Sequence, residues 1–176
     1  MKKLILIFFL SCSILYFGQI ENFKLENEQI SWQKIYDTDK SFDEIYDLIK
    51  SNTQFSDVVR DENSITFLIK DYSIDYKGAG GSLLMTNAYI SNSKYSGNVL
   101  LNFKDSKYRI TLSHIMYLYT SMDLNFGRNQ TSYSLEESVI KKSEFRSIYK
   151  KDSSIFNYSF TKLFDFSKYK KSTNDW

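Results

Sequence analysis

The sequence predicts an α+β domain built on a single antiparallel β-sheet, with its helices packed on one face and an element order of roughly β-α-β-β-β-β-α. Three observations predict it. Hydrophobic residues alternate in runs joined by short polar turns, helical stripes stand before and after those runs, and 176 residues suit one domain. The chain is 42% hydrophobic and 25% charged, which excludes a disordered chain and a polytopic membrane protein.

The N-terminal segment, residues 1–18, has the layout of a secretory signal peptide. Lys2 and Lys3 give it a basic start, and the apolar run from Leu4 to Phe17 is shorter than the roughly 20 residues that span a bilayer. Its removal takes two Lys and no acid from 23 basic and 21 acidic residues, which leaves no net charge. We therefore expect an exported protein of the periplasm or the extracellular space, with no transmembrane span in the mature chain.

The single cysteine, Cys12, lies within this segment. A mature chain cut near Gly18 has no thiol, so disulfides, thiol nucleophiles and cysteine-ligated metals are excluded. Cys12 also leaves an alternative open, a lipoprotein anchored through this residue. The lipidation signal has a Leu followed by two small residues before the cysteine, whereas Phe9 occupies the Leu position here.

The first strand and helix are expected early in the mature chain. Ile30–Tyr36 is rich in residues that favour strands. Ser41 and Glu44 have the spacing of a capping box, which binds the free amides at a helix N-terminus. Hydrophobic residues then follow at helical spacing, at Phe42, Ile45, Tyr46 and Ile49, and predict a helix with one face on the core.

Two hairpins are expected next. Phe55–Arg60 and Ser64–Lys70 are joined by a three-residue polar turn. Asn98–Lys104 and Lys107–Leu112 are joined by Asp105-Ser106, which sets a register that places all the bulky apolar side chains on one face. The predicted pairs on that face are Phe103 with Tyr108, Leu101 with Ile110, and Val99 with Leu112.

The stretch from Asp71 to Ser96 is the least regular and is expected to be mobile. It clusters Gly78, Gly80 and Gly81, but lacks the Gly-Lys-Ser/Thr of a phosphate-binding loop. Tyrosines surround these glycines, and we predict them as ligand-binding residues because Tyr combines contact area with hydrogen bonding. The predicted residues are Tyr72, Tyr76, Tyr89 and Tyr95.

The C-terminal part is predicted to be mainly helical. Beyond Tyr119, a polar connection that contains Gly127, Arg128 and Asn129 leads to Ser134. Ser134 and Glu137 repeat the capping-box spacing, and a helix to about Lys150 is expected. A last helix is indicated by Phe156, Phe160, Leu163 and Phe164 and should cover the sheet. The predicted divisions are therefore a signal peptide at 1–18, an α+β domain at 19–125, and a helical extension at 126–176 that packs on the sheet.

Three segments carry a resemblance to a known family: the strand and helix through Ile49, the run from Val58 into Ser64–Thr66, and above all residues 100–111, LLNFKDSKYRIT. On these segments the chain resembles a domain of unknown function with a TBP-like fold, found in exported proteins of Bacteroidetes. The resemblance spans about Ile30 to Leu118 and implies a TBP-like fold. The family has no assigned activity and no catalytic motif, so the resemblance implies no site residue.

The acid, base and metal-ligand residues match no catalytic motif. His114 is the only His, and the extended hairpin register places it on the apolar side, opposite Gly97. Acidic residues gather at expected turns and strand ends, without the spacing of a calcium loop. They are Asp57, Asp61 and Glu62, then Asp71 and Asp75. We therefore predict no catalytic residue, no metal and no cofactor.

The preferred functional hypothesis is a non-enzymatic envelope protein that acts as a binding or structural module. Its partner would be another envelope protein, a peptide or a glycan, bound by the sheet face or by the tyrosine-bearing loop. The alternative is a carboxylate-dependent hydrolase of the envelope that uses Asp71, Asp75 or Glu62. Basic residues gather in the C-terminal third, but a neutral exported chain argues against nucleic acid as a partner. The sequence does not indicate an oligomeric state.

Overall fold

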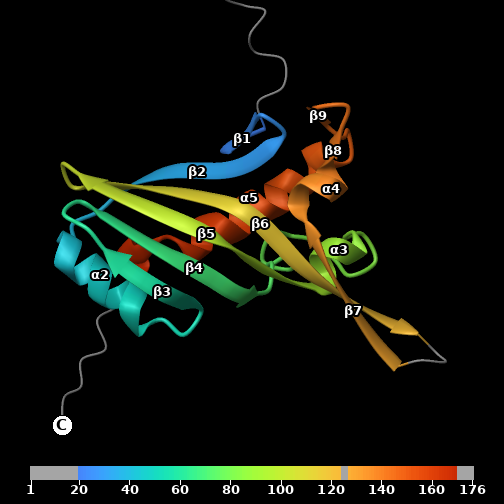
Figure 1. Ribbon diagram of the computed structural model, residues 1–176, viewed down its shortest axis with the longest axis horizontal. Helices are drawn as coiled ribbons and strands as arrows, with labels where there is room; N and C mark the ends of the chain where they lie inside the picture. The colour runs from blue at the N-terminus through green and yellow to red at the C-terminus, as the bar shows by residue number, and fades with distance from the viewer. Residues whose placement is uncertain (1–19, 124–126, 170–176) are drawn as a thin grey trace, which may run out of the picture.

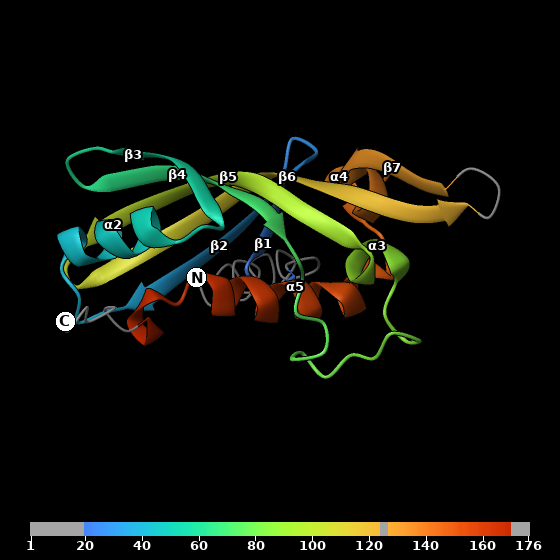
Figure 2. The same cartoon turned by 90° about the horizontal axis from the view of Figure 1, so that it is seen from below.

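The computed structural model describes residues 20–123 and 127–169, so the predicted signal peptide and Cys12 lie outside the described residues. Within these ranges, seven strands form an antiparallel sheet in the order β1-β2-β6-β5-β4-β3, and β7 pairs with the outer part of β6 (Figure 1). The helices α2 and α5 lie on the same face of this sheet (Figure 2). The predicted α+β class is therefore confirmed.

The elements follow one another with short connections, except between β4 and α3. In chain order they are β1 (Phe23–Glu26), β2 (Gln29–Asp37), α2 (Phe42–Ser51), β3 (Phe55–Arg60), β4 (Ser64–Tyr72), α3 (Ala88–Ser91), β5 (Ser93–Lys104), β6 (Lys107–Asp123), β7 (Gly127–Ser134), α4 (Leu135–Val139), β8 (Ile140–Lys141), β9 (Glu144–Phe145), α5 (Tyr149–Leu163) and the 3-10 turn η2 (Phe166–Lys168).

The N-terminal helix α2 begins as predicted. Ser41 Oγ accepts a hydrogen bond from the Glu44 amide at 3.2 Å, and the Glu44 carboxylate accepts one from the Ser41 amide at 3.0 Å. Ile45 and Ile49 are fully buried, one helical turn apart. The capping box and the apolar stripe together explain where this helix starts and which face it turns to the core.

Both predicted hairpins are confirmed, the second with its register. Phe103 stands opposite Tyr108, Leu101 opposite Ile110, and Val99 opposite Leu112. The strands extend further than the sequence indicated, because β5 already begins at Ser93 within the stretch expected to be irregular. That extension places Tyr95 in a strand.

The predicted position of His114, on the apolar side of the hairpin, is wrong. Ser96 pairs with Met116 and Asn98 with Ser113, so His114 and Ile115 together stand opposite Gly97 in a β-bulge. His114 has a positive φ of 51° and is exposed, while Ile115 is fully buried. The bulge therefore turns His114 away from the apolar side, where a continuous register would have placed it.

The polar connection expected after Tyr119 is a strand pair instead. β6 continues to Asp123, and β7 runs back along it, with Tyr117 opposite Tyr133. Figures 1 and 2 show that this hairpin extends beyond the rest of the sheet. Much of this hairpin does not pack on the core. Its sequence therefore lacks the alternation of apolar and polar residues by which strands are predicted.

The single helix expected from Ser134 to about Lys150 is also wrong. Ser134 caps a helix, but α4 ends at Val139 and is followed by the small hairpin of β8 and β9. A continuing apolar stripe would need hydrophobic residues at 142 and 143. Lys142 and Ser143 stand there with φ values of 55° and 59°, which form the turn of that hairpin.

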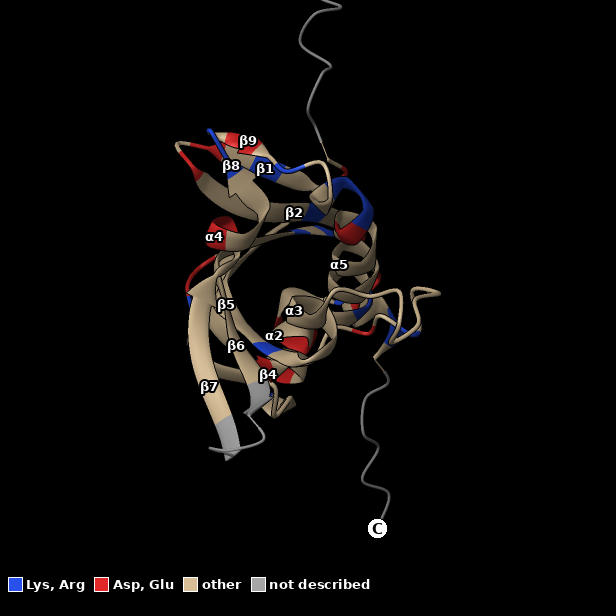
Figure 3. Cartoon of the chain, turned by 90° about the vertical axis from the view of Figure 1, so that its right-hand side faces the viewer, with Lys and Arg blue, Asp and Glu red and all other residues tan. Residues whose placement is uncertain are grey.

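The last helix, α5, is the centre of the core. Phe156 and Phe160 are fully buried, and the ring of Trp32 on β2 lies 5.6 Å from that of Phe160. Burying each such side chain contributes roughly 1.5–3 kcal/mol before entropy is counted. Figure 3 shows the sheet curving around α5. The prediction that this helix covers the sheet is confirmed.

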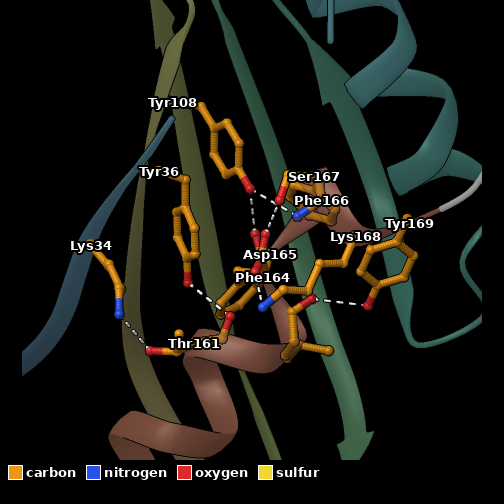
Figure 4. Close-up of polar contacts among 11 residues, drawn as sticks. Lys34, Tyr36, Tyr108, Thr161, Phe164, Asp165, Phe166, Ser167, Lys168 and Tyr169 are labelled. Atoms are coloured by element: carbon orange, nitrogen blue, oxygen red, sulfur yellow. Dashed lines mark hydrogen bonds and ion pairs between the residues drawn. The ribbon is translucent and has the colours of Figure 1, made fainter. Parts of the chain in front are cut away.

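Tyrosine hydroxyls fasten the C-terminal end of α5, where helix carbonyls lack partners within the helix. Tyr36 donates to the Thr161 carbonyl at 3.2 Å, and Tyr169 donates to the Leu163 carbonyl at 3.1 Å (Figure 4). Tyr108 donates to the carbonyl of Phe164 at 2.8 Å and accepts from the amide of Phe166 at 2.8 Å. These bonds fix the end of the helix against β2 and β6.

Candidate functional site

Three of the four tyrosines predicted to bind a ligand, Tyr72, Tyr89 and Tyr95, pack against α5, whereas Tyr76 lies in the loop between β4 and α3. Tyr72 and Tyr95 are buried, and Tyr76 and Tyr89 are half-buried. The rings of Tyr89 and Tyr95 both contact Phe156, at centroid distances of 6.1 and 5.3 Å. Tyr72 instead contacts Phe160, one turn further along the helix.

Three of these tyrosines use their hydroxyls inside the protein. The Tyr72 hydroxyl binds Ser159 Oγ at 2.7 Å, Tyr95 donates to the Tyr89 carbonyl at 2.7 Å, and Tyr89 donates to Asp152 Oδ2 at 2.8 Å. Burial raises the pKa of Tyr89 and of Tyr95 above the ordinary value, so both remain neutral donors. A ligand role for these residues stays a prediction, and their present contacts join β4, α3 and β5 to α5.

Two of the acidic residues noted in the sequence bind lysine, and one of them, Asp75, belongs to the hydrolase alternative. Asp57 Oδ2 lies 3.2 Å from Lys70 Nζ, and Asp75 Oδ2 lies 2.8 Å from Lys162 Nζ. These hydrogen bonds hold the pKa of both carboxyls below the usual range. A general acid needs the opposite shift, because it must keep its proton near neutral pH. In the described part of the chain, His, Cys, Asp and Glu form no group of three that could hold a metal ion.

The glycine cluster forms a tight turn. Gly80 has a φ of +81°, which glycine adopts without strain. A Cβ on Gly81 would lie 2.8 Å from the Tyr76 carbonyl oxygen, so only glycine fits there. The Gly81 amide donates to that same carbonyl at 2.7 Å, which occupies a donor that phosphate binding would need.

The face of the sheet opposite the helices is the candidate functional site. β2, β6, β5 and β4 lie side by side there, and no helix covers them in Figure 2. We call this surface the uncovered face and define it by three rows across these strands. The rows are Ser31, Ser113, Asn98 and Leu68; Gln33, Thr111, Leu100 and Thr66; and Ile35, Arg109, Asn102 and Ser64.

The uncovered face combines amides, hydroxyls and aliphatic side chains, and Arg109 is the one charged residue among those that define it. Gln33 Nε2 donates to Thr111 Oγ1 at 3.1 Å, and Arg109 donates to Asn102 Oδ1 at 3.2 Å, so neighbouring strands are tied across the surface. Ile35 is 62% exposed and Leu100 is 37% exposed. Leu100 stands between Thr66 and Thr111, whose hydroxyls can both donate and accept hydrogen bonds, whereas Ile35 stands opposite Arg109.

A depression of about 350 Å³ lies on this face. Thr66, Leu68, Asn98, Leu100 and Ser113 line it, together with Asp57 at the bulge of β3. The β5 and β6 side of this surface follows from the predicted hairpin register. The β2 and β4 side does not, because no local pattern reveals which strands flank a hairpin.

Two solved structures are similar to this chain, although no known protein-family profile and no curated protein match it. One is a TBP-like protein from Parabacteroides distasonis, with 16% sequence identity, 84% of this chain and 98% of that chain covered, and a TM-score of 0.49. The other is a DUF4468 family protein from Bacteroides ovatus, with 13% identity, 84% of this chain and 90% of that chain covered, and a TM-score of 0.49.

The descriptions of these two structures match the resemblance expected from the sequence. One is described as TBP-like and the other by a domain of unknown function, and both come from Bacteroidetes. Neither description names an activity, so no function is assigned through them. Among the residues that the structure describes, each helix is too short or too polar to cross a bilayer.

Proposed function

We propose that the protein is a non-enzymatic module of the cell envelope that binds another envelope protein through the uncovered face. The observation that carries this proposal is the one-sided placement of α2 and α5 (Figure 2). It leaves the three rows of side chains across β2, β6, β5 and β4 exposed or half-buried. The export part of the proposal rests on the signal-peptide layout of residues 1–18.

The composition of the uncovered face supports a protein partner. The centres of protein interfaces are depleted in charged residues, and this surface has Arg109 as its one charge among the defining residues. Leu100 lies at its middle, opposite Thr66 on one side and Thr111 on the other. An aliphatic side chain surrounded by hydrogen-bonding groups matches the apolar centre and polar rim of protein interfaces.

The hydrolase alternative has less support. Asp75, one of its candidate residues, forms an ion pair with Lys162, and its carboxylate accepts a hydrogen bond from the Gly78 amide at 2.9 Å. These contacts fit a carboxylate that holds a loop in place.

The test places a photo-crosslinking amino acid at Leu100 in cells that make the full chain, with the same group at Ser154 on the exposed side of α5 as the control. We expect one defined protein adduct from position 100 and none of that mass from position 154. The adduct is identified by mass spectrometry, which also gives the mass of the mature chain. The purified partner should then bind the protein and lose binding on Leu100→Asp.

Two results would overturn the proposal. The same adducts from both positions would show that the uncovered face is not selective. Binding to purified envelope polysaccharide that Leu100→Asp abolishes, without a protein adduct, would make the partner a glycan. Thr66→Arg, at a neighbouring exposed position, is the second variant if Leu100→Asp alters the circular dichroism spectrum.

A further inference from the structure

We propose that the loop between β4 and α3 is a membrane-contact site, whose tip of Leu83, Leu84 and Met85 inserts into the surface of an anionic lipid bilayer. The site lies on the helix side of the molecule, away from the uncovered face. It does not depend on the protein partner proposed above.

The three tip residues are the most concentrated exposed hydrophobic group in the described part of the chain. Leu83 is 60% exposed, Leu84 98% and Met85 73%, and they are consecutive. Large apolar side chains gathered at one exposed point mark interaction sites, whereas isolated ones are ordinary. Figures 2 and 3 both show this loop protruding past α5, on the side away from the sheet.

Both ends of the loop are fastened to α5. At the first end, the Asp75 amide donates to Ser159 Oγ at 2.8 Å and the Asp75 carboxylate binds Lys162. At the second end, Asn87 Nδ2 donates to Asp152 Oδ2 at 2.7 Å. The loop is therefore held at two points of a rigid helix, and its apolar tip is presented by the fold.

The backbone at the tip is partly satisfied by the loop itself. The amides of Met85 and Thr86 donate to the Ser82 carbonyl at 3.1 and 3.0 Å, which makes one helical turn. Backbone groups that are already hydrogen-bonded enter the lipid interface at a lower cost than free ones. The tip can thus leave water without unfolding.

The charges beside the loop fit an anionic surface. Lys77 in the loop is exposed, as are Lys150 and Lys151 on α5, and the buried face of α5 packs on the sheet. Two acidic residues near the loop do not oppose this attraction. Asp75 is ion-paired with Lys162, and Asp152 is buried. Apolar insertion combined with basic side chains at the surface is how proteins bind anionic bilayers.

A lipid surface fits this tip better than a second copy of the chain. Stable protein interfaces bury about 1,200 Å² or more in total, and three adjacent side chains supply only a part of that area. A bilayer accepts a small protruding tip of any shape. Self-association through the loop is therefore an outcome that the experiment must separate.

The experiment uses the full chain with Cys12→Ser and an environment-sensitive dye attached through Leu84→Cys. The control carries the dye through Val59→Cys on β3, because Val59 is also an exposed hydrophobic residue, at 62% against 98% for Leu84. We expect a blue shift at position 84 with vesicles of phosphatidylglycerol and phosphatidylcholine in equal parts, a smaller one with phosphatidylcholine alone, and none at position 59. Comparing two positions on one chain separates the loop from any insertion of the N-terminal segment.

The second readout is the dye shift after Leu83→Asp in the same chain. Loss of one inserted Leu corresponds to about ten- to hundredfold weaker partitioning of the tip. The proposal is overturned if position 84 shifts no more than position 59, or if Leu83→Asp leaves the shift unchanged. It is also overturned if position 84 shifts with protein concentration in the absence of vesicles, which would show contact between copies.

Discussion

Two fully buried tyrosines, Tyr95 and Tyr149, differ in whether the hydroxyl has a partner. The Tyr95 hydroxyl donates to the Tyr89 carbonyl, whereas that of Tyr149 has no hydrogen-bond partner within residues 20–123 and 127–169. We expect Tyr95→Phe to lower the free energy of unfolding by about 1 kcal/mol, because the half-buried Tyr89 carbonyl loses its donor. Tyr149→Phe should leave it unchanged or raise it by up to about 1 kcal/mol. Urea unfolding of both variants checks the pair, and equal losses would contradict it.

The buried tyrosines also show why the sequence alone does not reveal which way the side chains of the predicted tyrosine site face. The sequence indicated an irregular stretch rich in Tyr, and the structure has Tyr72 and Tyr95 on strands with their rings toward α5. Which way a tyrosine faces depends on the strand that continues through it. The hydroxyls of Tyr72 and Tyr89 form hydrogen bonds with Ser159 and Asp152. These partners lie more than 60 residues away in the chain, so no local pattern indicates them.

At the scale of elements, local sequence patterns predicted the strands and helices that bury one face in the core. They failed where a strand bulges, where the chain turns, and where a hairpin extends beyond the sheet. The β5–β6 register followed from its apolar pairs, and α2 from its capping box. The bulge at His114 was not predictable, because it depends on how Gly97 and its neighbours pack across strands. The turn at Lys142-Ser143 interrupts a stretch whose composition is compatible with a helix.

The connection between α5 and the β4–α3 loop depends on Asp152, which is 3% exposed and accepts hydrogen bonds from Asn87 and Tyr89. We expect Asp152→Ala to lower the free energy of unfolding by about 2–4 kcal/mol, because it leaves two donors unpaired in a largely buried place. Hydrogen exchange in residues 75–87 should become faster at the same time. Asp39→Ala, at an exposed position, is the control and should change stability by less than about 0.5 kcal/mol. Unchanged exchange in the loop would show that Asp152 does not hold it.

At the scale of the whole molecule, the fold presents two surfaces on opposite sides. The sheet curves around α5 (Figure 3). The buried aromatic and aliphatic side chains of the strands form the core together with those of this helix. The uncovered face, for which we propose a protein partner, lies on one side, and α5 with the attached β4–α3 loop lies on the other. The described residues contain no cysteine, and packing, hydrogen bonds and ion pairs such as Asp75–Lys162 connect the elements.

The reliance on buried tyrosines predicts cooperative unfolding at alkaline pH. Burial is the largest cause that raises the pKa of seven tyrosines: Tyr36, Tyr72, Tyr89, Tyr95, Tyr108, Tyr149 and Tyr169. Below a pH of about 10 these groups are neutral in both the folded and the unfolded chain, so they make no difference to stability there. Above it only the unfolded chain ionises freely, and each such tyrosine then lowers the free energy of unfolding by up to about 1.4 kcal/mol per pH unit.

We therefore expect the tyrosinate absorbance that comes from these seven tyrosines to increase as the far-UV circular dichroism is lost, in one steep transition within about two pH units above 10. The Tyr36→Phe variant should show a shallower transition, because one of the groups that ionise on unfolding is gone. Its neutral-pH stability, measured in urea, corrects for the lost hydrogen bond to Thr161. Gradual ionisation of the buried tyrosines while the circular dichroism stays native would contradict this account. In that case the aromatic core would have to admit water without unfolding.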